Sequence, residues 1–294
     1  MRYDIPASSS EEQILVYKAV GEKQVHLTFL PPKQKKFDRA PVYFIIPGGG
    51  WHTASKEAMI GFSGKSLNIL RERGWAVVSI DYRVCPKDGV VMNGVISDAM
   101  DAGRYLAHFA AELGIDARRI VTSGHSAGGH LALMMALAPH AGFAEDTPFD
   151  VVADDFGVVA TAPLSAPIIL YTDEGGFAPH GLNDLSDLFD LFPSKESSTR
   201  LRHVASPIDY VTPLSVPTLL VCGTHDDLVF AENSTSHYQR ARTLGAPCEI
   251  LYSVYGGHCF EPMVEGKISS PNFEEVQDAL VEFVSRFEED SAAE

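Results

Sequence analysis

Six short apolar runs rich in β-branched residues recur along this chain, and helix-like segments separate most of them. Their composition is typical of strands that are covered on both faces of a parallel sheet. Because parallel strands need crossover connections, usually helical, the alternation predicts an α/β fold with a mostly parallel sheet between layers of helices. The runs are residues 42–46, 75–80, 119–123, 157–162, 217–222 and 248–254.

The two ends of the chain complete this pattern. Residues 13–19 and 24–30 are β-prone and flank a short turn, which predicts an antiparallel hairpin. Residues 95–113 carry apolar side chains at helical spacing. Asn272 and Glu275 have the spacing of a capping box and predict the start of a final helix.

One long segment interrupts the alternation. Residues 166–212 are rich in Pro, Gly, Ser and Asp and contain a short helical pattern at 182–192. A connection of this length is uncommon in a compact domain unless it is functional, so we expect a single domain, 1–294, with a cap or lid insertion at 166–212. Four residues of the segment are expected either to form an apolar pocket wall or to anchor the cap: Tyr171, Phe177, Leu191 and Phe192.

The charge of the chain argues against one class of partner. The formal net charge is −16, and the 23 Lys and Arg residues form no cluster of the kind that nucleic-acid binding requires. No apolar stretch approaches the roughly 20 residues that span a bilayer, and the first ten residues lack the apolar core of a secretory signal. We therefore expect a cytoplasmic protein with no nucleic-acid or membrane partner.

The cysteines and histidines show no metal-ligand spacing. The cysteines are scattered, without a C-x-x-C pair, and are expected to carry free thiols. Among the 11 histidines, none has the spacing of a zinc-binding helix. We expect neither a metal nor a cofactor. The cysteines are Cys85, Cys222, Cys248 and Cys259.

A serine flanked by small residues lies between a strand-like and a helix-like run. Residues 119–138 read RIVTSGHSAGGHLALMMALA, with Ser126 inside Gly-His-Ser-Ala-Gly. In this context a G-x-S-x-G sequence predicts a nucleophile elbow, a sharp turn that presents the serine at the edge of the sheet. The N-terminus of the following helix favours an anion near Ser126, as the tetrahedral intermediate of acyl transfer requires.

A second glycine-rich turn follows the apolar run at 42–46. Residues 47–51 read Pro-Gly-Gly-Gly-Trp, and in folds with a nucleophile elbow this loop supplies backbone N–H donors to the oxyanion. We expect the N–H groups of Gly49, Gly50 and Ala127 to converge there. The alternative is a phosphate cradle, but neither common phosphate-binding pattern is present.

Two further loops offer an acid and a base, in the chain order Ser, acid, His that this fold uses. The run at 217–222 leads into Gly-Thr-His-Asp-Asp, where Asp226 is the expected acid and Asp227 its rival. The run at 248–254 leads into Tyr-Gly-Gly-His, which offers His258. His258 is expected to take the serine proton while the carboxylate fixes its tautomer.

Three side chains beside these loops are expected to contact the substrate, with Trp51 and His52 at the mouth of the pocket. They are Trp51, His52 and His125, and His125 is also expected to fill space at the elbow. His130, four residues after Ser126, is expected to be a packed or hydrogen-bonded helix residue.

Together these motifs resemble a known group of enzymes, the esterases related to hormone-sensitive lipase, with the bacterial feruloyl and acetyl-xylan esterases closest and arylformamidases also similar. The segments that carry the resemblance are PGGGW, VVSIDYR, LGIDARRI, GHSAGGH, SPIDYVTP, GTHDDLV and GGHCF, within residues 40–290. The resemblance implies an α/β-hydrolase fold with a mostly parallel eight-stranded sheet. It assigns the nucleophile, acid and base to Ser126, Asp226 and His258, and the oxyanion donors to Gly49, Gly50 and Ala127. One departure is Pro47, where the group has a histidine.

These observations predict a serine carboxylic ester hydrolase that works through an acyl-serine intermediate. Its expected substrates are short-chain acyl esters or acetylated or feruloylated carbohydrate esters. The alternatives are an arylformamidase-type amide hydrolase and a catalytically silent hydrolase-fold binding protein. The expected partner is a small-molecule ester, and a homodimer is left open.

Overall fold

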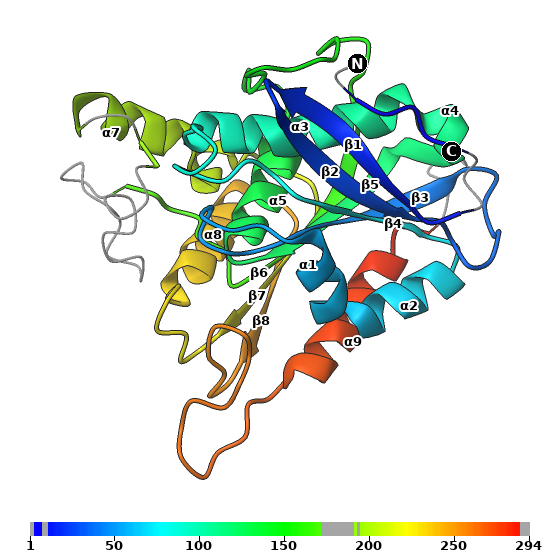
Figure 1. Ribbon diagram of the computed structural model, residues 1–294. Coiled ribbons are helices and arrows are strands. Elements are labelled where there is room, and N and C mark those ends of the chain that lie inside the picture. Colours follow the sequence, from blue (N-terminus) through cyan, green and yellow to red (C-terminus); the bar gives the residue numbers. More distant parts are fainter. Residues whose placement is uncertain (1–2, 8–10, 172–190, 193–194, 289–294) are drawn as a thin grey trace.

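The computed structural model describes residues 3–7, 11–171, 191–192 and 195–288 (Figure 1). Within these ranges, eight strands form one sheet in the order β1-β2-β4-β3-β5-β6-β7-β8. The strands are β1 (Gln13–Val20), β2 (Lys23–Leu30), β3 (Ala40–Ile46), β4 (Ala76–Ile80), β5 (Ile115–His125), β6 (Val158–Leu164), β7 (Thr218–Gly223) and β8 (Cys248–Ser253). The helices are α1 (Lys56–Phe62), α2 (Gly64–Glu72), α3 (Met92–His108), α4 (Ala110–Leu113), α5 (Ala127–Leu137), α7 (Lys195–Val204), the 3-10 helix η1 (Pro207–Tyr210), α8 (Glu232–Leu244) and α9 (Phe273–Ser285).

The sheet is parallel apart from its first strands. β1 pairs with β2 and β2 with β4 in antiparallel register, and every later pair is parallel. The hairpin, the apolar strands and the mostly parallel sheet predicted from the sequence are therefore confirmed. The parallel strands end at one edge of the sheet, and the loops that leave this edge hold the candidate site.

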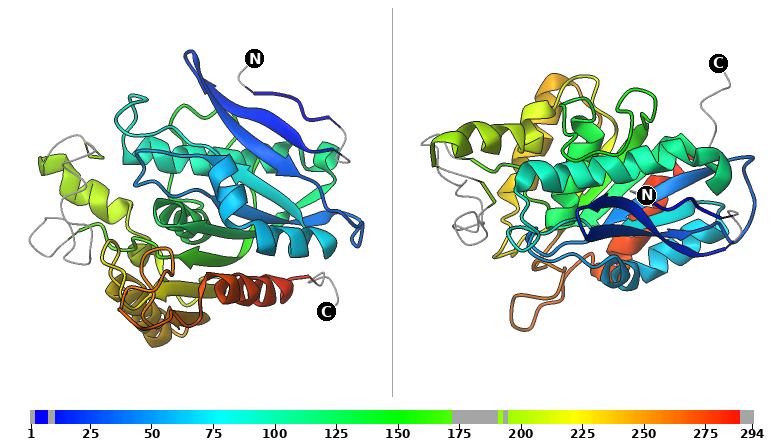
Figure 2. Two further views of the ribbon diagram at one scale, coloured as in Figure 1. Left: turned by 60° about the horizontal axis from the view of Figure 1, so that its bottom comes forward. Right: turned by 45° about the horizontal axis from the view of Figure 1, so that its top comes forward.

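The two faces of the sheet are covered by different helices, as Figure 2 shows. Val42 and Phe44 of β3 pack with residues of α3 and α5 on one face. Tyr43 and Ile45, the alternate residues of the same strand, pack with residues of α1, α2 and α9 on the other face. All seven residues of β3 are buried, because side chains on successive residues point to opposite faces that are both covered.

Two predicted helices have informative ends. The segment predicted at 95–113 is divided by Phe109, which ends α3 and begins the short helix α4. The predicted capping box of α9 is confirmed, because the Asn272 side chain accepts from the Glu275 N–H while Glu275 accepts from the Asn272 N–H. These bonds satisfy N–H groups that a helix leaves unpaired at its first turn.

The ends of the predicted cap pack against the body. Leu191 is fully buried, and its carbonyl oxygen accepts from Met92 N at 3.0 Å. The Tyr171 ring stacks on His203 with the ring centroids 3.6 Å apart, and the Arg202 guanidinium lies over the Phe192 ring. Leu191 is thus anchored to α3, whereas the contacts of Tyr171 and Phe192 with α7 hold parts of the predicted cap together.

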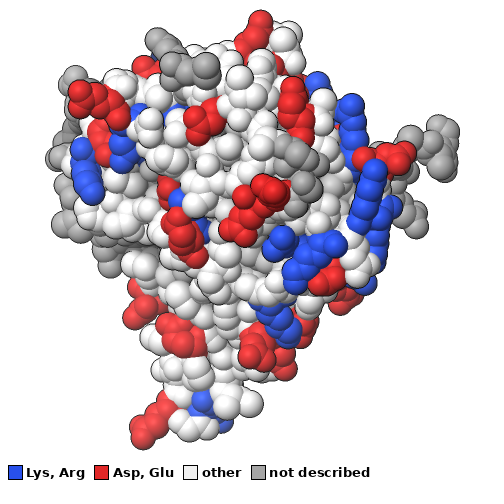
Figure 3. All heavy atoms as spheres, turned by 45° about the vertical axis from the view of Figure 1, so that its right-hand side comes forward, with Lys and Arg blue, Asp and Glu red and all other residues white. Residues whose placement is uncertain are grey.

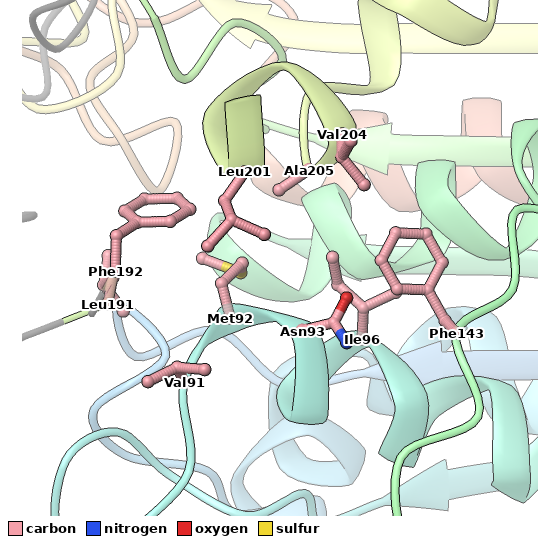
Figure 4. A pocket seen from close by; sticks show the side chains of 10 residues that line it. All are labelled: Val91, Met92, Asn93, Ile96, Phe143, Leu191, Phe192, Leu201, Val204 and Ala205. Atoms are coloured by element: carbon pink, nitrogen blue, oxygen red, sulfur yellow. The ribbon is translucent and has the colours of Figure 1, made fainter. Parts of the chain in front are cut away.

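Other parts of the cap prediction lie outside the described residues, namely Phe177 and most of the helical pattern at 182–192. At the base of the segment, side chains from α3 and α7 and from residues 191–192 surround an apolar cavity of about 10 Å³ (Figure 4). A space of this size is about that of one water molecule. The side chains therefore pack closely there.

A buried cluster of charges joins β1 to α3. Lys18 Nζ lies 2.8 Å from Asp98 Oδ1 and 2.7 Å from Asp101 Oδ2, and all three side chains are fully buried. Arg83 pairs with Asp98, and Arg104 pairs with Asp101. Each buried carboxylate therefore has two cationic partners, which offsets the cost of removing the charges from water.

The surface mixes both signs of charge. On the face drawn in Figure 3, acidic side chains are spread widely, and basic side chains gather toward one side with acidic ones between them. In the described part of the chain, no helix combines the length and apolar character needed to cross a bilayer.

Candidate active site

Ser126 lies in a strained turn between β5 and α5. Its backbone has φ 56° and ψ −123°, a conformation that non-glycine residues rarely adopt. The turn is held by the Ser126 N–H, which donates to Leu164 O at 2.8 Å. The flanking Gly124 and Gly128 are required, because a Cβ at either would lie within 2.4 Å of a backbone oxygen.

The glycine loop that follows β3 lies against this turn. A Cβ on Gly48 would lie 2.8 Å from the His125 carbonyl oxygen and 3.2 Å from Ser126 Cβ. Gly49 and Gly50 have φ values of 121° and 60°, which favour glycine. The sequence motif did not single out Gly48, yet this residue lies directly against the serine turn.

The predicted oxyanion donors share one property. Within the described residues, the N–H groups of Gly49, Gly50 and Ala127 donate no hydrogen bond. The Ala127 N–H is the first of α5, where the helix itself supplies no acceptor. These three N–H groups therefore have no acceptor within the described residues.

Asp226 and His258 form a hydrogen-bonded pair. His258 Nδ1 lies 2.8 Å from Asp226 Oδ2, and Asp226 Oδ1 accepts from the N–H groups of Leu228 and Val229 at 3.0 and 2.8 Å. An ionised carboxylate only accepts, so Nδ1 carries the proton and Nε2 is left as a base. The Asp226 side chain is fully buried and 14% of the His258 side chain is exposed.

Asp227, the rival acid, is exposed. The structure therefore brings the first of the two adjacent carboxylates to the histidine.

The loops that carry the acid and the base are joined by backbone contacts. Thr224 N donates to Ser253 O at 3.0 Å, and His225 N donates to Gly256 O at 2.9 Å. Tyr255 N donates to the Thr224 hydroxyl at 3.0 Å. These bonds hold the two loops together as one unit.

His125 connects this unit to the elbow. Its Nε2 lies 2.8 Å from the carbonyl oxygen of His258, and the two imidazole rings have centroids 4.6 Å apart. Within the described contacts, the Ser126 hydroxyl and His258 have no direct hydrogen bond. Hydrogen bonds between catalytic groups often tighten when substrate binds.

Backbone strain concentrates around these loops. Six non-glycine residues in the described part of the chain have positive φ, and five of them follow β3, β5, β6 or β8. Strained residues persist where the surrounding structure holds them, and they cluster at functional sites. The five are Trp51, Ser126, Ser165, Tyr255 and Phe260.

The prediction for Trp51 is wrong. It was expected at the pocket mouth, but its side chain is fully buried and its Nε1 donates to His130 Nδ1 at 3.2 Å. His130 Nε2 in turn donates to Ala205 O at 2.7 Å, and burial lowers the pKa of His130 to about 4. The backbone of Trp51 has φ 60°, and its indole has a buried acceptor on α5, so the ring belongs to the core.

The other two predicted substrate-contacting residues line clefts. His125 lines a cleft of about 320 Å³ between the glycine loop and α1, together with Met59 and Phe62. His52 is exposed and lines a neighbouring, more polar cleft of about 480 Å³. Within the described residues, no group of three His, Cys, Asp or Glu side chains gathers where it could hold a metal ion, and the four cysteines are free thiols.

Comparison with known proteins places this arrangement in a family. Residues 27–240 match the sequence model of the BD-FAE family. The chain belongs to the BD-FAE family. This BD-FAE member is also 28% identical over 240 residues to a Mycobacterium tuberculosis protein named Esterase LipC, and 28% identical over 209 residues to one named probable carboxylic ester hydrolase LipM. These matches cover 79% and 69% of the chain, and 56% and 45% of the two relatives.

The chain thus spans about half the length of these two relatives. It also matches 6% of a much longer protein, the non-reducing polyketide synthase Preu6 of Preussia isomera, with 31% identity over 135 residues. Among solved structures, the fold is similar to that of esterase 2 from Thermogutta terrifontis, with a TM-score of 0.74, 24% identity and 95% of both chains covered. The sheet and its flanking helices confirm the predicted α/β-hydrolase fold for this BD-FAE member.

Proposed function

We propose that this BD-FAE family member is a serine carboxylic ester hydrolase, in which Ser126 is the nucleophile, His258 the general base and Asp226 the orienting acid. The observation that carries the proposal is the Asp226–His258 pair, which is tied to the nucleophile elbow by the contact of His125 with His258. The names of the relatives LipC and LipM support the same reaction class.

The proposed reaction begins when His258 Nε2 takes the proton of Ser126 Oγ as this oxygen attacks the ester carbonyl carbon. The negative charge moves to the carbonyl oxygen, where the N–H groups of Gly49, Gly50 and Ala127 stabilise it. The intermediate collapses to an acyl-serine, and the alcohol leaves with the proton from His258. Water then attacks the acyl-serine by the same steps, which releases the acid and restores the serine.

The cleft beside the glycine loop supports a small substrate. Its volume of about 320 Å³ and its apolar residues, which include Ala58, Met59 and Phe62, suit a small ligand. A structure of the T. terrifontis enzyme was solved with propionate bound. We infer short-chain acyl esters as the substrate class, with acetylated or feruloylated carbohydrate esters as the natural candidates.

The test is hydrolysis of p-nitrophenyl acetate by the wild-type protein and by Ser126→Ala, with circular dichroism to show that both are folded. The proposal predicts turnover by the wild type and its loss in the variant. Turnover retained by Ser126→Ala would refute the assignment of the nucleophile. A panel of acetylated sugars, feruloyl esters and N-formylkynurenine then separates carbohydrate ester hydrolysis from arylformamidase activity.

A further inference from the structure

The imidazole of His125 lies where three segments of the site meet. Its Nε2 contacts the His258 carbonyl oxygen at 2.8 Å, and its ring centroid is 5.1 Å from that of Phe62 on α1. A Cβ on Gly48 would lie 3.3 Å from His125 Nδ1. The side chain next to Ser126 therefore touches the base loop, the glycine loop and α1 together.

The chemistry of this contact defines the proton position on His125. A carbonyl oxygen only accepts, so Nε2 must carry the proton and donate it to His258 O. Burial, and after it the neighbouring His258, lower the pKa of His125 to about 4. His125 therefore stays neutral at neutral pH and does not compete for the serine proton, whereas His258 has a buried carboxylate partner.

The loop that carries His258 is long and irregular. Residues 254–272 connect β8 to α9, and the bridges within this connection are two isolated pairs, Val254 with Ser270 and Gly256 with Pro262. Both bridges tie the loop to itself. The contacts with residues 224 and 225 secure its start, and the His125 bond secures the base residue to the elbow.

We propose that His125 is a positioning residue, whose Nε2–H···O=C bond to His258 holds the general base at the elbow within reach of Ser126. This inference rests on the proposed ester hydrolysis. It assigns to the histidine of the Gly-His-Ser-Ala-Gly motif a role in proton transfer that acts through His258, in addition to its place in the wall of the cleft.

Two substitutions separate the hydrogen bond from the packing. His125→Phe keeps an aromatic ring of similar size and removes the donor, whereas His125→Gln places an amide N–H near the position of Nε2 and removes the ring. We expect His125→Phe to lower kcat by about 10- to 100-fold, because small displacements of reacting groups have effects of this size, with KM changed by less than about threefold. His125→Gln is expected to restore kcat at least about tenfold above the Phe variant.

The matched control is His237→Phe. His237 is buried on α8, and among the described residues its Nδ1 has no hydrogen-bond partner. The same substitution there removes a buried imidazole away from the proposed machinery. Its kcat is expected to equal that of the wild type. A His125→Phe variant that is folded and has wild-type kcat, or a Gln variant no better than Phe, would show that the ring only packs and would overturn the proposal.

Ser126→Ala measured in the same series keeps the two proposals distinguishable. Activity in that variant refutes Ser126 as the nucleophile, whatever His125 does. A readout without turnover is the downfield proton NMR signal of His258 Nδ1–H, which is shared with Asp226. His125→Phe should shift or broaden this signal, and an unchanged signal would contradict the positioning role.

Discussion

Asp226→Asn provides the strongest single test of how the base is oriented. In the structure, Asp226 Oδ1 accepts from two backbone N–H groups, and Oδ2 accepts from His258 Nδ1. The oxygen of an asparagine would keep the two backbone bonds, and its NH₂ group would face Nδ1. Two donors would then oppose each other, so His258 would turn Nδ1 into the acceptor and move its proton to Nε2.

A proton on Nε2 prevents His258 from accepting the serine proton. The expected loss in kcat is about 10⁴-fold, which corresponds to about 5 kcal/mol of transition-state stabilisation. The assay is steady-state hydrolysis of p-nitrophenyl acetate, with thermal unfolding to show that the fold is intact. The matched control is Asp227→Asn, which changes the adjacent exposed acid and should leave kcat unaltered. A folded Asp226→Asn variant that keeps more than about a tenth of wild-type kcat would refute the reasoning.

Three further predictions concern the glycine loop, the buried charges and the effect of pH. Gly48→Ala should lower kcat by about 100-fold, because its Cβ would meet the carbonyl oxygen of residue 125 at 2.8 Å and displace the loop; steady-state kinetics measures this, and a wild-type kcat would contradict it. Lys18→Ala should lower the free energy of unfolding by about 3–5 kcal/mol, because Asp98 and Asp101 would lose a shared buried cation; urea denaturation measures this, and a loss below about 1 kcal/mol would contradict it. Burial lowers the pKa of His237 from 6.5 to about 4, so the unfolded chain binds more protons between these pH values and stability falls as pH drops below 6.5. Between pH 7 and pH 5 the wild type should therefore lose about 2 kcal/mol more unfolding free energy than His237→Leu. Urea titrations measure this, and the same pH dependence in both proteins would contradict it.

The strands could be predicted from the sequence because runs such as VYFII suit a strand buried on both faces, and β3 is buried throughout. β5 shows where this reasoning fails. The predicted run began at residue 119, but the strand begins at Ile115 and includes Asp116 and Arg118. Ile115 pairs with Ala40 of β3 and the next pair is Ile120 with Val42, so Asp116 and Arg118 lie in an irregular stretch of the ladder, which apolar periodicity does not detect.

The candidate site was predicted in part. The motifs identified Ser126, Asp226 and His258 because strained turns and paired polar groups need particular residues at particular loop positions. Contacts between distant residues were beyond the sequence. The partner of Trp51 is 79 positions away, and the carbonyl that His125 contacts is 133 positions away, so both side chains were read as substrate contacts. The close approach of Gly48 to the elbow could not be predicted for the same reason, because the two segments are far apart in the sequence.

The central claim is that Ser126 forms a covalent bond with an electrophilic substrate. The most direct measurement is reaction with a fluorophosphonate probe, followed by intact-mass and peptide mass spectrometry. The account predicts one adduct per chain, located on the peptide that contains Ser126, and no adduct in Ser126→Ala. An unmodified wild-type protein, or an adduct on another residue, would contradict the account.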